Sequence, residues 1–175
     1  MSRRFAFVAV VAVASFVSVG VVHAVQSDFG RPADTSEIDN WGIIIGPDGE
    51  GLPVGGATAA EGKAVYERRC ARCHGVGGTE GPDARLVGGR GTLATSAAQK
   101  TVGSYWPTAT TLWDYINRAM PFDQPGYLTT DEVYGAVAYV LYLNDIVGEQ
   151  DRLDNATLAD VPMPNRDGFV VDPRR

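Results

Sequence analysis

The stretch that decides how this chain folds is ERRCARCHGVGG, residues 67–78. It contains both cysteines of the sequence, Cys70 and Cys73, and one of its two histidines, His74. Residues of these types hold metals, form disulfides or carry prosthetic groups, and here they lie almost side by side. The remaining sequence indicates which of these uses applies.

Two common uses of a C-x-x-C pair are poorly supported. A structural zinc site requires four ligands, but the only other Cys or His is His23, within the apolar N-terminal segment. A thioredoxin-like redox pair normally follows a strand and opens a helix in a βαβ unit. Cys70 and Cys73 instead close an expected helix, so a plain disulfide or redox pair is the weaker alternative.

The third use includes His74, because C-x-x-C-H is the attachment signature for c-type haem. Cys70 and Cys73 would form two thioethers to one covalently bound haem c, and His74 would ligate the iron from the proximal side. The sequence therefore predicts a haem site at residues 70–74.

The sixth iron ligand is expected to be a methionine, since no second histidine follows the N-terminal segment. Met120 lies in RAMPFDQP, where prolines stiffen the loop and can hold a thioether rigidly. Met163, in VPMPNR, is the alternative, and an open sixth position is a third. Either methionine could instead simply fill the core.

Three helices are expected, and two begin with a capping box. Thr58-x-x-Glu61 precedes AAEGKAVYERRC, and Thr129-x-x-Glu132 precedes a long apolar run ending in VLYLN. Between them, TATTLWDYINRAM has an apolar residue at every third or fourth position: Leu112, Tyr115, Ile116 and Ala119. The chain is therefore expected to be all-α.

The N-terminus is expected to be an export signal. In residues 1–24, Arg3 and Arg4 precede an apolar run that ends in a small-residue cleavage pattern. An uncleaved membrane anchor is the alternative. We expect a periplasmic protein with a loop-rich arm over residues 25–57, a haem domain over 58–146 and a C-terminal tail over 147–175.

The composition is acidic, which narrows the classes of partner. The net charge of the 175 residues is −6, and removal of Arg3 and Arg4 with the signal would make it about −8. No basic run is present to neutralise phosphates, so no nucleic-acid partner is expected. A protein partner with a basic patch would suit this charge better.

Taken together, the helix order and the two ligand motifs resemble the class I cytochrome c fold. In that fold the first and last helices cross closely, which the resemblance implies for Gly62 and Tyr66 against Tyr139 and Tyr142. A four-helix-bundle cytochrome would have its haem motif near the C-terminus instead.

Six segments of the sequence extend the resemblance beyond the haem motif to one particular group of cytochromes. They are GRPADTSEIDNWGIIIGPDGEGLPVG, GKAVYERRCARCHG, LVGGRGTL, KTVGSYWPTATTLWDYINRAMPF, DEVYGAVAYVLYLN and MPNRDGF. Together they resemble the first haem domain of the cytochrome subunit of sulfane dehydrogenases, with related cytochromes serving sulfite dehydrogenases. The resemblance implies a molybdenum-containing catalytic subunit as partner, a downstream electron acceptor, and Arg90, Tyr105 and Trp106 lining the haem and its propionates.

The expected function is electron transfer rather than catalysis. Two strong axial ligands leave the iron no position for a substrate. A catalytic set of Ser, His and an acid is not expected either, because the one histidine after the N-terminal segment is already assigned to the iron. The alternatives are a general diffusible carrier, a five-coordinate haem sensor or peroxidase, and a structural subunit.

Overall fold

The computed structural model describes residues 30–35, 44–170 and 172–174. The chain divides into two units, residues 1–34 and 35–175, and the helices and strands described below belong to the second. The expected export signal lies outside the described residues. Within the described ranges, no helix has the length and apolar character needed to cross a membrane.

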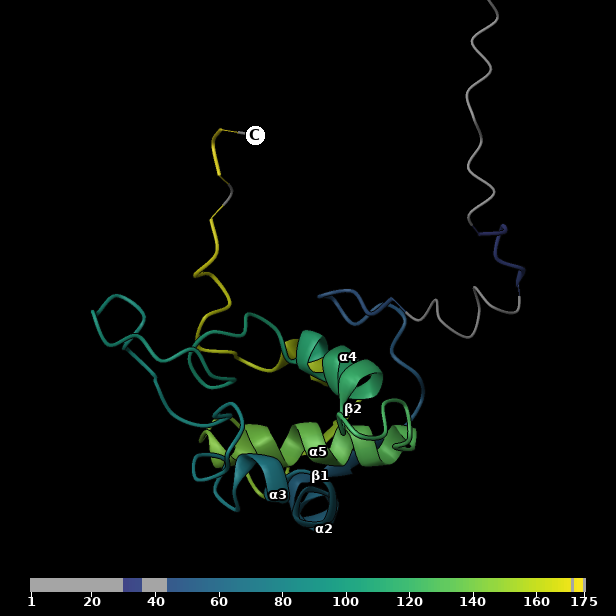
Figure 1. The fold of residues 1–175 in the computed structure, drawn as a ribbon, viewed down its shortest axis with the longest axis horizontal. Coiled ribbons are helices and arrows are strands. Elements are labelled where there is room, and N and C mark those ends of the chain that lie inside the picture. Colours follow the sequence, from purple (N-terminus) through teal and green to yellow (C-terminus); the bar gives the residue numbers. More distant parts are fainter. Residues whose placement is uncertain (1–29, 36–43, 171, 175) are drawn as a thin grey trace, which may run out of the picture. The chain divides into compact units, whose positions relative to one another are not determined.

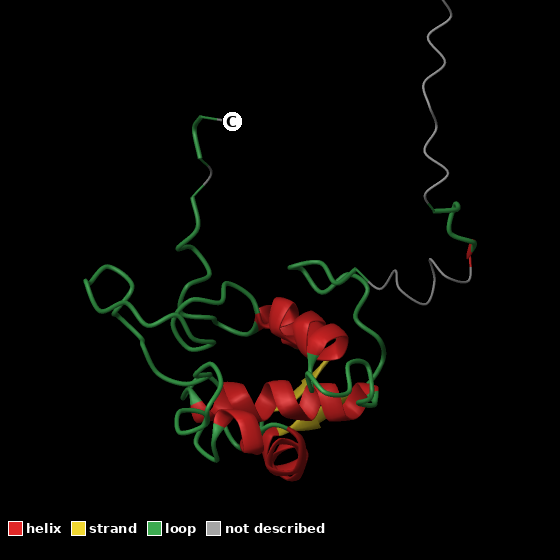
Figure 2. Ribbon diagram, in the orientation of Figure 1, coloured by secondary structure: helices red, strands yellow, loops and turns green. Residues whose placement is uncertain are grey.

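The second unit is built mainly from helices, with one small sheet (Figures 1 and 2). In chain order its elements are β1 (Gly56–Thr58), α2 (Ala59–Arg69), α3 (Ala71–His74), α4 (Ala109–Ala119), α5 (Thr130–Leu143), β2 (Arg152–Asp154) and the 3-10 helix η1 (Leu158–Asp160). Figure 1 shows α5 between α4 and α2.

The capping boxes predicted from the sequence are confirmed. The Thr58 hydroxyl accepts from the Glu61 backbone N–H at 3.2 Å, and the Glu61 carboxylate accepts from the Thr58 N–H at 2.8 Å. Thr129 and Glu132 make the same reciprocal pair at the start of α5. These side chains satisfy N–H groups that have no partner inside the helix.

Helices α2 and α5 cross where two glycines meet. A Cβ on Gly62 would overlap the carbonyl of Gly135, so the two backbones approach with no side chain between them. Next to this crossing the rings of Tyr66 and Tyr139 are 5.1 Å apart. The expected crossing is confirmed for Gly62, Tyr66 and Tyr139, while Tyr142 is 36% exposed.

Helix α4 buries Leu112 and Ile116 of the expected apolar stripe, but Tyr115 of that stripe is 45% exposed and Trp113 is buried instead. The Trp113 ring contacts Tyr134 of α5, with the ring centroids 5.5 Å apart. Trp113 therefore takes the buried place that the spacing had assigned to Tyr115.

The segment after α5 folds back onto the domain. β2 pairs antiparallel with β1, placing Gly56 opposite Asp154 and Thr58 opposite Arg152. Four apolar side chains of this segment are at most 4% exposed: Leu153, Leu158, Val161 and Met163. No strand was expected here, because three residues are too few for an alternating pattern to be recognised.

The arm before β1 is fastened to α4 and α5. The Tyr134 hydroxyl donates to the carbonyl of Pro53 at 3.0 Å, and the Thr110 hydroxyl donates to that of Pro47 at 3.4 Å. Burial, with smaller contributions from Asp154 and Asp131, raises the pKa of Tyr134 to about 12. The phenol therefore stays neutral in the folded protein after it would ionise in the unfolded chain.

This pKa predicts a pH dependence. Between pH 10 and 12 the unfolded chain binds fewer protons at Tyr134 than the folded protein does, so stability falls as pH rises through this window. Tyr134→Phe should lose about 1 kcal/mol at pH 7 with the Pro53 hydrogen bond, yet lose stability less steeply above pH 10. Urea unfolding of the haem-loaded protein at pH 7, 10, 11 and 12 measures both effects. The exposed Tyr127→Phe is the control, and equal alkaline slopes in both variants would contradict the prediction.

Candidate functional site

The two cysteines lie on one continuous turn of backbone. Cys70 ends α2 with its N–H donating to the Tyr66 carbonyl at 2.8 Å, and its own carbonyl accepts from the His74 N–H at 2.9 Å. Both cysteines are free thiols and partly buried. The short helix α3 thus places His74 directly after two partly buried cysteines.

The Cys70 thiol is neutral near pH 7. Burial, followed by the nearby Cys73, raises the pKa of Cys70 to about 11 because the thiolate is poorly solvated there. Thioether formation adds the S–H across a vinyl group and leaves a neutral sulfur, so the covalent product would place no charge in this poorly solvated position. A catalytic redox cysteine would instead have a lowered pKa.

The His74 ring is oriented by one hydrogen bond. Its Nδ1 lies 2.8 Å from the carbonyl oxygen of Ala84. A carbonyl can only accept, so Nδ1 carries a proton, and in the neutral ring the lone pair is then on Nε2. This is the tautomer that binds a metal through Nε2, with the second nitrogen held by a backbone carbonyl.

The loop that supplies this carbonyl is fitted closely to the cysteine segment. The Asp83 N–H donates to the Cys73 carbonyl at 3.0 Å, and the Tyr66 hydroxyl donates to the Gly75 carbonyl at 2.9 Å. A Cβ on Gly81 would overlap the Cys73 carbonyl. Glycine at this position therefore allows the loop to lie directly against the Cys73–His74 backbone.

Met120 and Met163 lie in different surroundings. Met120 ends α4, donates its N–H to the Ile116 carbonyl at 3.1 Å, and is only partly buried at the edge of the core. Met163 is 4% exposed and belongs to the core itself. A partly covered thioether at a helix end suits a ligand, whereas the surroundings of Met163 are those of a core side chain.

The loop after Met120 contacts the segment that carries the cysteines. Arg69 lies over the Tyr127 ring, 4.5 Å from its centroid, and donates to the Gln124 side chain at 3.4 Å. Arg72 pairs with Asp123 at 3.2 Å. The structure therefore brings the two segments predicted to carry iron ligands together through side chains on both.

The three residues implied by the family resemblance lie in different places. Arg90 is exposed and donates to the backbone carbonyl of Asn144 at 3.1 Å. The Tyr105 ring contacts Phe169 edge-on, with the centroids 5.2 Å apart, and Trp106 is partly buried with its ring 5.5 Å from that of Tyr115. The proposed role of these residues toward haem propionates stays a prediction.

Two contributors to the site were missed from the sequence. Ala84 orients His74 through its backbone carbonyl, so its residue type contains no signal. Asn144, the last residue of DEVYGAVAYVLYLN, is 7% exposed and hydrogen-bonded to the loop that contains Ala84. The sequence signal for Asn144 was a polar residue at the end of an apolar helix. If such a side chain is buried, it must form hydrogen bonds with other parts of the chain.

These features fit a covalently attached haem. Cys70 and Cys73 can supply the two sulfurs, and the neutral His74 ring, with Nδ1 donating to Ala84, can offer Nε2 to a metal. The core of the domain also has apolar side chains at its edge that the polypeptide covers only in part, among them Ala71, Leu86, Trp106, Met120, Leu143 and Ile146. Incompletely covered apolar surface of this kind is what a porphyrin packs against.

Comparison with known proteins agrees with this geometry. Residues 59–144 match the family model described as Cytochrome c. The structure is similar to a chain of the crystal structure of the sulfane dehydrogenase SoxCD from Paracoccus pantotrophus, with a TM-score of 0.76 and 39% sequence identity over 84% of this chain and 73% of that chain. No curated protein sequence matched. The chain therefore belongs to the cytochrome c family, with the all-α fold of its class I members, a covalently bound haem c and a role in electron transfer.

Proposed function

We propose that this chain is a monohaem cytochrome that accepts single electrons from a molybdenum-containing dehydrogenase of sulfur compounds and passes them toward the respiratory chain. The observation that carries the proposal is the 39% identity to a chain of a sulfane dehydrogenase, spread over 84% of this chain. Sulfane and sulfite oxidation are the two reactions that such a partner would perform. The proposed location is the periplasm, where haem is attached to this type of motif.

The polypeptide has the groups that such a carrier requires. Haem c supplies a reversible one-electron couple at its iron. Cys70 and Cys73 anchor it, while His74 Nε2 and Met120 Sδ are the proposed axial ligands. If His74 and Met120 both bound the iron, they would exclude substrate from it and limit it to exchanging electrons. This supports an electron-transfer subunit more than a sensor or peroxidase.

The loop after Met120 offers a contact surface for a partner. Phe122 is 86% exposed and Tyr127 is 58% exposed on this loop. Exposed aromatic side chains are enriched at protein interfaces. The neighbouring charges are mixed, because Arg72 pairs with Asp123 and Arg68 with Glu132. Docking at this loop would bring a donor close to the proposed Met120 ligand.

The proposal is tested by gently purifying the native protein from periplasmic extract and assaying it for molybdenum and a second polypeptide. The expected result is molybdenum with a stoichiometric partner, together with reduction of the cytochrome when thiosulfate or sulfite is added without oxygen. A lone haem protein that neither compound reduces, even when extract is added back, would overturn the sulfur-oxidising role. It would favour the general diffusible carrier instead.

A further inference from the structure

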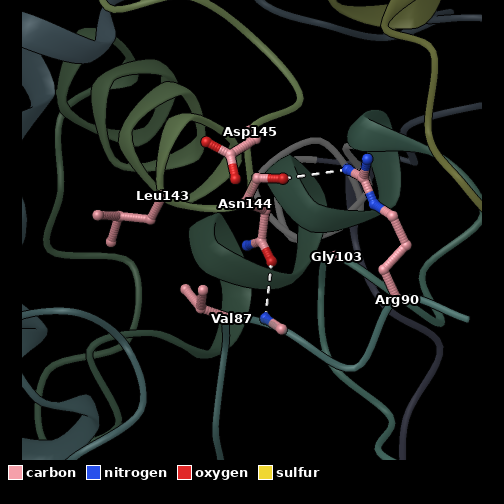
Figure 3. Close-up of a pocket in the computed structure, with 7 residues that line it drawn as sticks. Val87, Arg90, Gly103, Leu143, Asn144 and Asp145 are labelled. Atoms are coloured by element: carbon pink, nitrogen blue, oxygen red, sulfur yellow. Dashed lines mark hydrogen bonds between the residues drawn. The ribbon is translucent and has the colours of Figure 1, made fainter. Parts of the chain in front are cut away.

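The Asn144 side chain makes three hydrogen bonds at the end of α5. Its Nδ2 donates to the carbonyls of Val140 at 2.9 Å and Leu86 at 3.1 Å. Its Oδ1 accepts from the Gly88 N–H at 3.1 Å, the bond marked at the side-chain oxygen in Figure 3. Two carbonyls and one N–H determine which end of the amide is nitrogen. The side chain therefore joins α5 to the loop at Leu86 and Gly88.

This loop is the one that orients the proposed iron ligand. Two residues before Leu86, the Ala84 carbonyl accepts from His74 Nδ1 at 2.8 Å. Leu86 is held from other sides as well, because its N–H donates to Gly78 at 2.8 Å and its carbonyl accepts from Val102 at 3.2 Å. A short, hydrogen-bonded path of backbone thus connects Asn144 to the His74 ring.

The amide of Asn144 has little freedom to move. A Cβ on Gly103 would overlap its Oδ1, so only glycine leaves room at that position. Arg90 donates to the Asn144 backbone carbonyl at 3.1 Å, and both residues line a pocket of about 220 Å³ (Figure 3). Asn144 is therefore positioned more rigidly than an ordinary helix-terminal residue.

We propose that Asn144 is a positioning residue that tunes the iron through His74, by holding the Ala84 carbonyl at hydrogen-bonding distance from Nδ1. Donation from Nδ1 makes the imidazole a stronger donor to a metal at Nε2. A stronger donor stabilises the oxidised iron and lowers its reduction potential. The inference rests on His74 being the iron ligand of the proposed electron carrier, and does not depend on which partner supplies the electrons.

The test compares Asn144→Ala with a matched control, Tyr134→Phe. The control also removes a side-chain hydrogen bond to a backbone carbonyl, but from the first part of α5 and without contact to the Ala84 loop. Redox titration of the purified, haem-loaded cytochrome should show that Asn144→Ala shifts the reduction equilibrium about threefold to tenfold toward the reduced state, about 28 to 59 mV for one electron. The control should shift it less than about twofold.

A second readout follows the proton itself. NMR of the reduced, isotope-labelled protein should show the His74 Nδ1 proton exchanging with solvent about tenfold faster in Asn144→Ala than in the wild type. Gly103→Ala provides an independent variant, because it displaces the amide without removing it. It should raise the potential in the same direction.

The inference would be overturned if Asn144→Ala and Gly103→Ala lowered stability but changed neither the reduction potential nor the exchange rate of the Nδ1 proton. Asn144 would then only anchor the end of the helix. If Asn144→Ala fails to load haem, the reduction potential and the Nδ1 exchange rate of Gly103→Ala alone support or contradict the inference. Both measurements use the isolated cytochrome, so failure to find a molybdenum partner would not affect them.

Discussion

The Met120→Ala variant is expected to lose the sulfur-to-iron charge-transfer band completely and to bind added imidazole at the vacated position. The reason is that Met120 is the methionine at the edge of the core, on the loop that Arg69 and Arg72 hold against the cysteine segment. Its reduction potential should also fall, because a thioether ligand favours the reduced iron. Absorption spectra of both oxidation states, with an imidazole titration, measure these changes.

Met163→Ala is the matched control, because it removes the same side chain from a different environment. Met163 is 4% exposed in the core, so its truncation should cost about 2 to 5 kcal/mol of stability while leaving the iron spectrum unchanged. The reverse pattern would make Met163 the ligand. Wild-type spectra in both variants would mean that neither methionine binds iron, and would favour the sensor or peroxidase alternative.

The Gly62→Ala variant is expected to lose about 3 kcal/mol of stability, a large effect for the addition of one methyl group. The new Cβ would meet the Gly135 carbonyl, which is part of the α5 backbone and cannot rotate aside as a side chain can. The gain in helix propensity from Gly to Ala, about 1 kcal/mol, is smaller than this cost. Urea unfolding of the haem-loaded protein, followed by circular dichroism, measures the difference.

Gly135→Ala tests the same contact from the opposite helix. Its Cβ would lie 2.9 Å from the Gly62 Cα, a less severe overlap, so the loss should be smaller than for Gly62→Ala. Lys63→Ala, at an exposed position of α2, should change stability by no more than about 0.5 kcal/mol. If both glycine variants matched Lys63→Ala, the two helices would not approach as closely as the structure shows.

Several features of this protein could be predicted from the sequence because they depend on neighbouring residues. Both capping boxes are formed within four residues of chain, and the structure confirms them. The Cys70, Cys73 and His74 motif likewise lies within one turn of backbone. The cytochrome c family, its helical fold and its electron-transfer role followed from these local patterns and from the resemblance they supported.

Other features required the folded chain because their partners lie far apart in sequence. Asn144 binds Leu86 across 58 positions, and β1 pairs with a strand that follows α5. Tyr115 and Trp113 both have apolar character, and only the packing of α4 against α5 decides which is buried.

The orientation of His74 shows most clearly which features the sequence predicts and which depend on the folded chain. The sequence alone determined that a histidine follows two cysteines, which is enough to predict an iron ligand. The tertiary structure decided which ring nitrogen is free, because the acceptor is a backbone carbonyl that every residue possesses. Sequence patterns encode side-chain chemistry and short-range geometry, whereas the position of a distant carbonyl depends on the whole path of the chain between them.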